Sequence, residues 1–120
     1  MSPDTRHVLV VDDDAEFRFL HSELLKTFGY EVEVAADGAE AMALLTPLTD
    51  LVVLDAQMPN VDGFEVARLI REDPSVAEVP IVMVTGLAGR EDRLRAFDLG
   101  INDFITKPVD PQELRLRARW

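Results

Sequence analysis

The sequence predicts an α/β protein with a doubly wound sheet of five parallel strands in the order 2-1-3-4-5. Short apolar segments alternate with segments of helical periodicity along the whole chain, as in parallel sheets whose strands are joined by helices. The 120 residues are 48% hydrophobic and 29% charged, a composition typical of one soluble globular domain. Right-handed crossovers between five strands then favour the doubly wound order.

The predicted strands are short, and most are rich in β-branched residues, as buried strands are. Glu31–Ala35 differs because acid and valine alternate there, so we expect an edge strand with one face in water. The five segments are His7–Val11, Glu31–Ala35, residues 50–54, Ile81–Thr85 and Asp103–Thr106.

Capping residues mark the predicted helices. We expect Asp14 to cap the first helix. An aspartate followed three residues later by a glutamate opens three others: Asp37 with Glu40, Asp62 with Glu65, and Asp110 with Glu113. Apolar residues recur at helical spacing in the first and fourth helices, and each is followed by a glycine: Phe17, Leu20, Leu24, Phe28 and Gly29, then Leu94, Phe97 and Gly100.

The last segment, LRLRARW, carries two conflicting signals. Its alternation of apolar and basic residues is formally a strand pattern. Asp110 followed by Pro111 is a strong helix start, and Leu, Arg and Ala are good helix formers, so we predict a short helix. The chain then forms a single domain over residues 1–120, either complete or cut from a longer chain.

Charge and composition exclude several classes of function. The net charge of −11 has the wrong sign for a domain that binds nucleic acid through its phosphates. The absence of cysteine excludes disulfides and zinc–thiolate sites. The longest uncharged run covers residues 79–89 and is too short to cross a bilayer. An acidic chain suits divalent cations or basic partner surfaces, although acidity also serves solubility alone.

Polar residues lie at the carboxyl ends of four predicted strands: Asp12, Asp13 and Asp14, then Asp55, Thr85 and Lys107. Ligands bind at this edge of a doubly wound sheet. Clustered carboxylates need a counter-charge, which a hard cation such as Mg²⁺ supplies. A carboxylate can also form an aspartyl phosphate, while lysine and a hydroxyl bind phosphoryl oxygens. The set therefore indicates phosphoryl transfer.

In this arrangement the chain resembles the receiver domain of bacterial two-component response regulators. The resemblance covers nearly the whole chain and rests on five features in order: Asp12 with Asp13, Asp55 within LDAQMPNVDG, Thr85, Lys107 and the following Pro108. It implies the flavodoxin-like (βα)5 fold and a cytoplasmic signalling switch rather than an enzyme. The switch would accept a phosphoryl group from a sensor histidine kinase or a phosphotransfer protein.

Carried over by position, the resemblance implies a metal site around the acceptor. Asp55 is the expected phosphoacceptor. Asp13 is the expected direct ligand of Mg²⁺, which Mn²⁺ can replace, and Asp12 assists through water or as a second ligand. The backbone carbonyl of Gln57 is the expected third protein ligand, while Asp14 caps the first helix.

The resemblance also implies the moving parts of the switch. The Thr85 hydroxyl is expected to move to hold the phosphoryl group, and Lys107 is expected to form an ion pair with that group. The peptide bond before Pro108 is expected to be cis. Phe104 corresponds to the aromatic residue that turns inward as Thr85 moves, although a plain core role is an alternative. The expected output surface is the fourth helix, fifth strand and fifth helix. This surface would pair two copies or contact an effector domain, although a merely solvated charged face is an alternative. It holds six of the 12 basic residues: Arg90, Arg93, Arg95, Arg115, Arg117 and Arg119.

Three other classes of protein share parts of this fold and residue pattern. Phosphatases of the haloacid-dehalogenase type normally carry a second acid two residues after the nucleophile, where this chain has Gln57. A flavin-binding module needs a first loop that binds phosphate, and the acidic loop here would repel it. An unphosphorylated receiver-like interaction domain would not need the intact set of acceptor, acid pair, threonine and lysine.

Overall fold

The structure is a computed structural model and describes residues 5–58, 62–86 and 90–119. Within these ranges, strands and helices alternate from β1 to α5. The strands form one sheet in the order β2-β1-β3-β4-β5, and all neighbouring strands are parallel. The predicted fold class and strand order are therefore confirmed.

The bounds of the elements follow the prediction closely. The strands are β1 (His7–Val11), β2 (Glu31–Ala35), β3 (Leu51–Asp55), β4 (Ile81–Thr85) and β5 (Asp103–Thr106). The helices are α1 (Ala15–Thr27), α2 (Gly38–Leu44), α3 (Gly63–Glu72), α4 (Arg90–Asp98) and α5 (Pro111–Arg117).

The prediction for the third strand was wrong by one residue at each end. Asp50 lies before β3, where its carboxylate accepts a hydrogen bond from the His7 N–H at 2.8 Å and its own N–H donates to the His7 carbonyl. Asp55, in contrast, is the last residue of β3. The expected acceptor is therefore held by the sheet itself and not by a loop.

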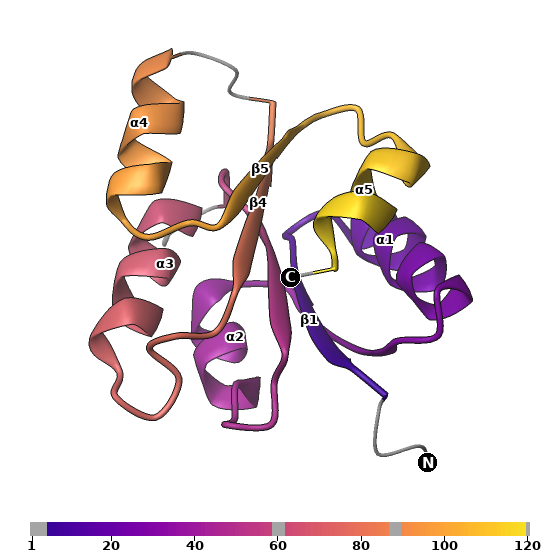
Figure 1. The fold of residues 1–120 in the computed structure, drawn as a ribbon, viewed down its shortest axis with the longest axis horizontal. Helices are drawn as coiled ribbons and strands as arrows, with labels where there is room; N and C mark the ends of the chain where they lie inside the picture. The colour runs from indigo at the N-terminus through magenta and orange to yellow at the C-terminus, as the bar shows by residue number, and fades with distance from the viewer. Residues whose placement is uncertain (1–4, 59–61, 87–89, 120) are drawn as a thin grey trace.

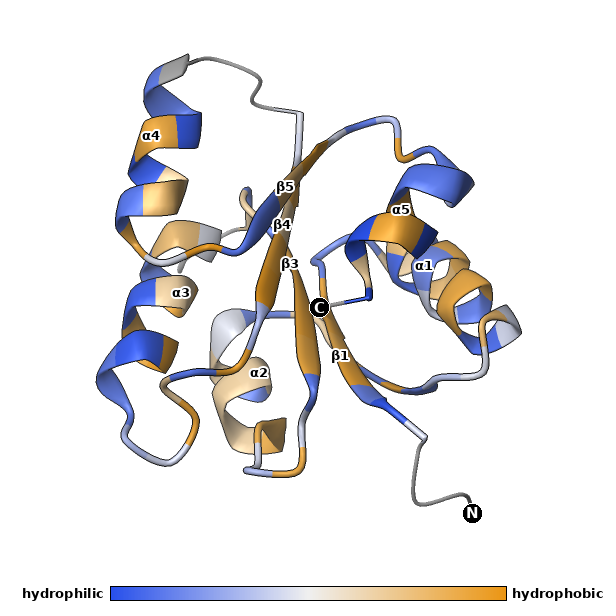
Figure 2. Ribbon diagram, in the orientation of Figure 1, coloured by the Kyte–Doolittle hydropathy of each residue, from blue (hydrophilic) through white to orange (hydrophobic). Residues whose placement is uncertain are grey.

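Helices cover both faces of the sheet (Figure 1), with α1 and α5 on one face and α2, α3 and α4 on the other. Strand residues alternate between two apolar clusters: Val8 and Val10 pack with the α1–α5 layer, and Leu9 and Val11 pack with the opposite layer. Figure 2 shows the strands as a hydrophobic layer between the helices. Burial of this apolar area on both faces is the main stabilising term of the fold.

Side-chain caps begin four of the helices as predicted. Asp14, Asp37, Asp62 and Asp110 each accept hydrogen bonds from N–H groups in the first turn of the following helix. Pro111 opens α5, which runs to Arg117, so the helix prediction for the last segment is confirmed over residues 114–117, and Trp120 lies outside the described residues. Gly29 and Gly100 follow α1 and α4 with φ of 92° and 79°, a backbone conformation that favours glycine.

The predicted apolar faces of α1 and α4 were only partly right. Leu20, Leu94 and Phe97 are each more than half exposed. In α1 the buried positions are His21, Ser22 and Leu25 instead, and in α4 the small Ala96 is buried. A short helix that packs through small residues can leave larger side chains in solvent, so spacing alone does not identify the face.

None of the helices in the described ranges combines the length and the hydrophobicity that a bilayer crossing requires.

Candidate functional site

Three carboxylates meet at the carboxyl edge of the sheet. Asp12 follows β1 directly and Asp55 ends β3, the neighbouring strand, so both reach the same edge. One oxygen from each of Asp12, Asp13 and Asp55 lies within 4.8 Å of the others. Asp12 and Asp55 are buried, while Asp13 is exposed. The structure therefore brings the three predicted acids together, with one of them open to solvent.

The Asp55 carboxylate is in an unfavourable electrostatic environment. Burial, followed by the nearby charge of Asp12, raises the pKa of Asp55 from 3.8 to about 6. The N–H of Gln57, which donates to the Asp55 carboxylate at 3.2 Å, and the Lys107 ammonium both oppose this rise in pKa. At neutral pH the carboxylate is still mostly ionised, so it is a buried nucleophile with only partial compensation of its charge.

Lys107 places a positive charge beside Asp12 and Asp55. Its Nζ lies 3.4 Å from Oδ1 of Asp55 and 3.6 Å from Oδ2 of Asp12. The Lys107 N–H donates to the Thr85 carbonyl at 2.8 Å, which continues the pairing of β4 with β5 beyond the end of β5. The peptide bond between Lys107 and Pro108 is cis, as predicted.

Thr85 lies on β4, the strand next to the acceptor strand β3, and Phe104 lies one strand further out, on β5. Thr85 is the last residue of β4 and is fully buried. Phe104 in β5 is also buried, at 5% exposure, and the Arg93 guanidinium of α4 lies 5.4 Å from its ring centroid. The aromatic residue is therefore turned inward in this structure and is covered by α4, a contact that the sequence did not reveal.

Asp14 has the role of a cap. Its carboxylate accepts hydrogen bonds from the N–H groups of Glu16 and Phe17, at 2.8 and 3.3 Å. Its own N–H donates to the Asp12 carboxylate at 3.0 Å. The third acid of the run thus links the start of α1 to the acid pair.

Gly63 packs against the backbone of the acceptor Asp55, a contact that the sequence did not indicate. A Cβ atom added at Gly63 would lie 2.2 Å from the Asp55 carbonyl oxygen and 2.7 Å from the Ala56 Cα atom. The Gly63 N–H donates to the Ala56 carbonyl at 3.0 Å. Only glycine permits this approach of α3 to the end of β3, so the Asp-Gly pair at residues 62–63 is more than a helix start.

A cavity of about 490 Å³ opens beside the acids. Asp13 and Gln57 line it on the side of the acceptor, and Asp92 and Arg95 line it on the side of α4. The Arg95 guanidinium lies 4.2 Å from the centroid of the Phe64 ring, which also lines the cavity. A small ligand thus has room to approach the exposed acid.

The donor set fits a divalent metal ion. The three acids offer oxygen atoms, the ligands that Mg²⁺ and Mn²⁺ prefer. Two of these acids are buried side by side, where their repulsion favours uptake of a cation. Within the described ranges of the chain, these acids are the one group of three His, Asp or Glu residues close enough to share an ion.

Comparisons with known proteins agree with this geometry. A family model described as "Response regulator receiver domain" matches residues 8–119. Response regulator PleD of Caulobacter vibrioides is 42% identical over 114 residues, which cover 93% of this chain and 25% of PleD. The DNA-binding dual master transcriptional regulator RpaA of Synechocystis is 40% identical over 113 residues, which cover 93% of this chain and 47% of RpaA. The chain spans less than half the length of either relative.

Solved structures of similar size have the same fold. Chemotaxis protein CheY4 of Vibrio cholerae aligns with a TM-score of 0.89 at 32% identity, covering 96% of this chain and 97% of the other. A putative response regulator from Chloroflexus aurantiacus aligns with a TM-score of 0.90 at 32% identity, covering 97% of this chain and 96% of the other. Receiver domains are signalling domains that respond to phosphorylation and bind a divalent metal. Because the family match spans nearly the whole chain, the protein belongs to the response regulator receiver domain family.

Proposed function

We propose that this domain is a phosphorylation switch in which Asp55 accepts a phosphoryl group from the phosphohistidine of a sensor kinase or phosphotransfer protein. An Asp55 oxygen attacks phosphorus, the P–N bond breaks, and the imidazole nitrogen keeps the electron pair. The observation that carries the proposal is the buried Asp55 carboxylate within reach of two further acids and of Lys107. This set combines a nucleophile with groups that bind phosphoryl oxygens.

Asp12, Asp13 and the backbone carbonyl of Gln57 are the proposed metal ligands, together with Asp55. A bound Mg²⁺ would neutralise charge on the phosphoryl oxygens. Asp12 and Asp55 keep the site anionic and buried, and the exposed Asp13 faces the cavity by which an ion and a phosphodonor can enter. The negative site would otherwise repel an anionic phosphodonor, so we expect transfer to depend on the metal.

Lys107 and Thr85 are the residues that we propose to bind the oxygen atoms of the phosphoryl group on Asp55. Lys107 already contacts Asp55 and needs only a small movement to pair with a phosphoryl oxygen on that residue. Thr85 ends β4, the strand next to β3, and would donate its hydroxyl proton to a phosphoryl oxygen. A shift of Thr85 would alter the packing around Phe104, which contacts α4 through Arg93. The effect of phosphorylation at Asp55 would thereby be transmitted to α4.

The proposed acceptor can be tested with acetyl phosphate or a phosphorylated kinase in the presence and absence of Mg²⁺. We expect the intact mass to increase by one phosphoryl group in the wild type with Mg²⁺, and not in Asp55→Asn or in chelator. Asp50→Asn is a matched control because Asp50 lies just before β3, at the end of the strand opposite to Asp55. An adduct of unchanged yield in Asp55→Asn would refute the assignment.

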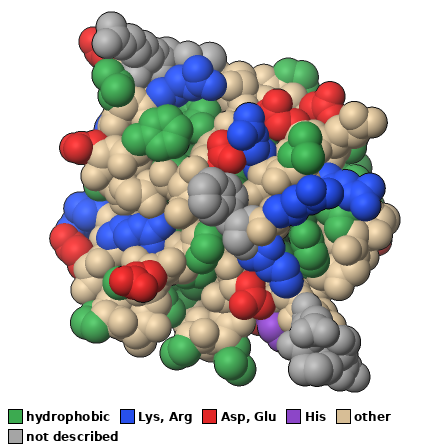
Figure 3. All heavy atoms as spheres, in the orientation of Figure 1, with side chains coloured by type: hydrophobic (Ala, Val, Ile, Leu, Met, Phe, Trp, Pro, Cys, Tyr) green, Lys and Arg blue, Asp and Glu red, His purple; other side chains and the backbone are tan. Residues whose placement is uncertain are grey.

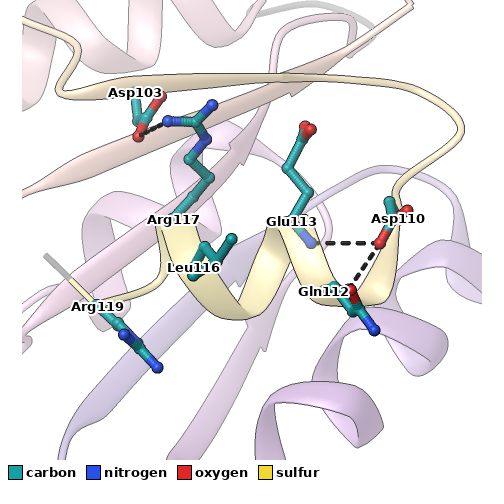
Figure 4. Close-up of a pocket in the computed structure, with 7 residues that line it drawn as sticks. All are labelled: Asp103, Asp110, Gln112, Glu113, Leu116, Arg117 and Arg119. Carbon is teal, nitrogen blue, oxygen red and sulfur yellow. Dashed lines mark hydrogen bonds and ion pairs between the residues drawn. The ribbon is translucent and has the colours of Figure 1, made fainter.

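We further propose that the face formed by α4, β5 and α5 carries the output. Leu94, Phe97 and Leu116 are more than half exposed there, and Figure 3 shows basic and acidic side chains interspersed with hydrophobic ones on this side of the molecule. Figure 4 shows the cavity beside α5, where Arg117 pairs with Asp103 at 3.2 Å. Ion pairs of this kind can be exchanged between two copies related by a two-fold axis.

Dimerisation through this face can be measured by sedimentation with and without a phosphodonor. We expect phosphorylation to raise the average mass toward that of a dimer, and Phe97→Asp to prevent this increase. Leu48→Asp is the matched control, since Leu48 is also exposed but lies between α2 and β3. Dimerisation that is equally strong in Phe97→Asp would place the interface elsewhere.

The longer relatives suggest the setting of the domain. PleD is a response regulator, and RpaA is a DNA-binding transcriptional regulator, and each is more than twice the length of the matched segment. We propose that residues 1–120 form one receiver domain that controls an effector domain or a separate partner protein. The acidic net charge of −11 supports an output in which this domain does not itself bind nucleic acid.

A further inference from the structure

The Lys107 ammonium has a third neighbour besides the two carboxylates. Its Nζ lies 4.6 Å from the centroid of the Phe17 ring, while it lies 3.4 Å from Asp55 and 3.6 Å from Asp12. A cation at this distance from a ring face is attracted by the electrons of the ring. Lys107 therefore lies between two anionic partners and one uncharged partner.

Phe17 is itself held from two sides. Its N–H donates to the Asp14 cap, and its ring stacks on His21, one turn further along α1, with the centroids 5.8 Å apart and the planes inclined by 24°. His21 is buried, which lowers the pKa of its imidazole and keeps this stack neutral at pH 7. The Arg18 guanidinium donates to the Asp12 carbonyl at 2.9 Å, which ties the same turn of α1 to the acid pair. The ring is thus held in place before any ligand arrives.

We propose that Phe17 is a positioning residue that holds the Lys107 ammonium at the phosphoryl site while its carboxylate partners are engaged elsewhere. The proposal rests on the proposed function of Asp55. A divalent cation competes with Lys107 for oxygen atoms of Asp12 and Asp55, but it does not compete for the face of a benzene ring. The contact with Phe17 therefore persists when the carboxylates turn to other partners, and it keeps Lys107 close to the incoming phosphoryl group.

The contact between ring and ammonium can be measured directly, because the chain has only two lysines, Lys26 and Lys107. In a lysine-labelled sample, the ring current of Phe17 should shift the ε-methylene protons of Lys107 upfield. Lys26, which pairs with Glu23 at 3.2 Å on the surface of α1, is the internal reference. We expect this upfield shift, with and without Mg²⁺, in the wild type and in Phe17→Trp, and its loss in Phe17→Leu. The same Lys107 shift in Phe17→Leu and wild type would overturn the proposal.

The effect of changes at Phe17 on the rate of phosphoryl transfer distinguishes an electronic role of the ring from a structural one. We expect Phe17→Leu to lower the rate of phosphorylation by acetyl phosphate about fivefold, as expected for loss of a partly desolvated cation–π contact. Site-specific incorporation of phenylalanine with one, two or three ring fluorines weakens the attraction while it hardly changes ring size. The logarithm of the rate should then fall in proportion to the number of fluorines.

Phe28 provides the matched control for this series. It is half-buried at the end of α1 and has the Arg115 guanidinium 5.5 Å from its ring centroid. Fluorination at Phe28 should leave the rate unchanged. An equally flat series at Phe17 would mean that the ring only fills space, and would overturn the proposal. A wild-type protein that accepts no phosphoryl group would instead refute the proposed function, and the NMR comparison would still decide whether Phe17 holds Lys107.

Discussion

Replacement of Asp55 by asparagine should make the protein more stable at neutral pH. Burial and the charge of Asp12 raise the pKa of Asp55 from 3.8 to about 6, so the ionised carboxylate destabilises the folded state. A difference of about 2 pKa units at 1.36 kcal/mol each corresponds to about 3 kcal/mol. Asparagine has nearly the same size without the charge, so we expect Asp55→Asn to gain about 2–3 kcal/mol at pH 7 in chelator.

The sign of the pH dependence follows from the raised pKa. Between pH 3.8 and about 6 the folded wild type binds more protons than the unfolded chain, so its stability falls as the pH rises and levels off above pH 6. Asp55→Asn lacks this loss. Its advantage should therefore shrink to about 1 kcal/mol near pH 4.5 and vanish at lower pH.

Thermal and urea unfolding of the two proteins at pH 4.5 and pH 7 would test this reasoning. For a domain of this length about 4 °C of melting temperature corresponds to 1 kcal/mol, so the expected gain at pH 7 is about 8–12 °C. Glu33→Gln, an exposed carboxylate on the edge strand β2, corrects for the general benefit of removing one charge from an acidic protein. A stability difference that is constant with pH, or an Asp55→Asn protein less stable than wild type at pH 7, would refute the explanation by burial.

Three further predictions concern the parts that surround the acceptor. Gly63→Ala should destabilise the fold and reduce phosphoryl labelling of Asp55, because the new Cβ atom would collide with the Asp55 backbone. Gly86→Ala is the control, because a Cβ atom there would lie 4.0 Å from its nearest neighbour, the Gln57 side chain. Equal melting temperatures of the two variants would contradict the steric argument. Arg71→Met should cost about 2–4 kcal/mol in urea unfolding, because the Arg71 guanidinium donates to the carbonyls of Ala77, Val79 and Gly100 and to Asn102. Its control is Arg68→Met, which removes exposed ion pairs with Glu65 and Glu72 on the same helix, and a similar loss in both variants would rule out a special role for Arg71. Mg²⁺ should raise the melting temperature of the wild type and chelator should reverse the rise; a rise of the same size in Asp13→Asn would argue against Asp13 as a ligand.

Much of the site could be predicted because parallel strands bring their carboxyl ends to one edge. Once the chain is divided into five strands, Asp12, Asp55 and Lys107 must converge, whatever the details of packing. The helix caps were equally predictable, because each depends on residues within three positions of one another. Even the conflict in LRLRARW was resolved by the local start signal at Asp110 and Pro111.

By itself, the sequence determined the order of elements and the acidic edge of the sheet, because these depend on local patterns and on the geometry common to all doubly wound sheets. Only the tertiary structure decided which residues of the helices contact the strands and loops of the site. Phe17 and Lys107 are 90 positions apart (107 − 17), Gly63 lies against the backbone of Asp55, and Arg93 covers Phe104. These contacts depend on the rotation and depth of each helix against the sheet, which side-chain packing sets and which periodicity in the sequence does not specify.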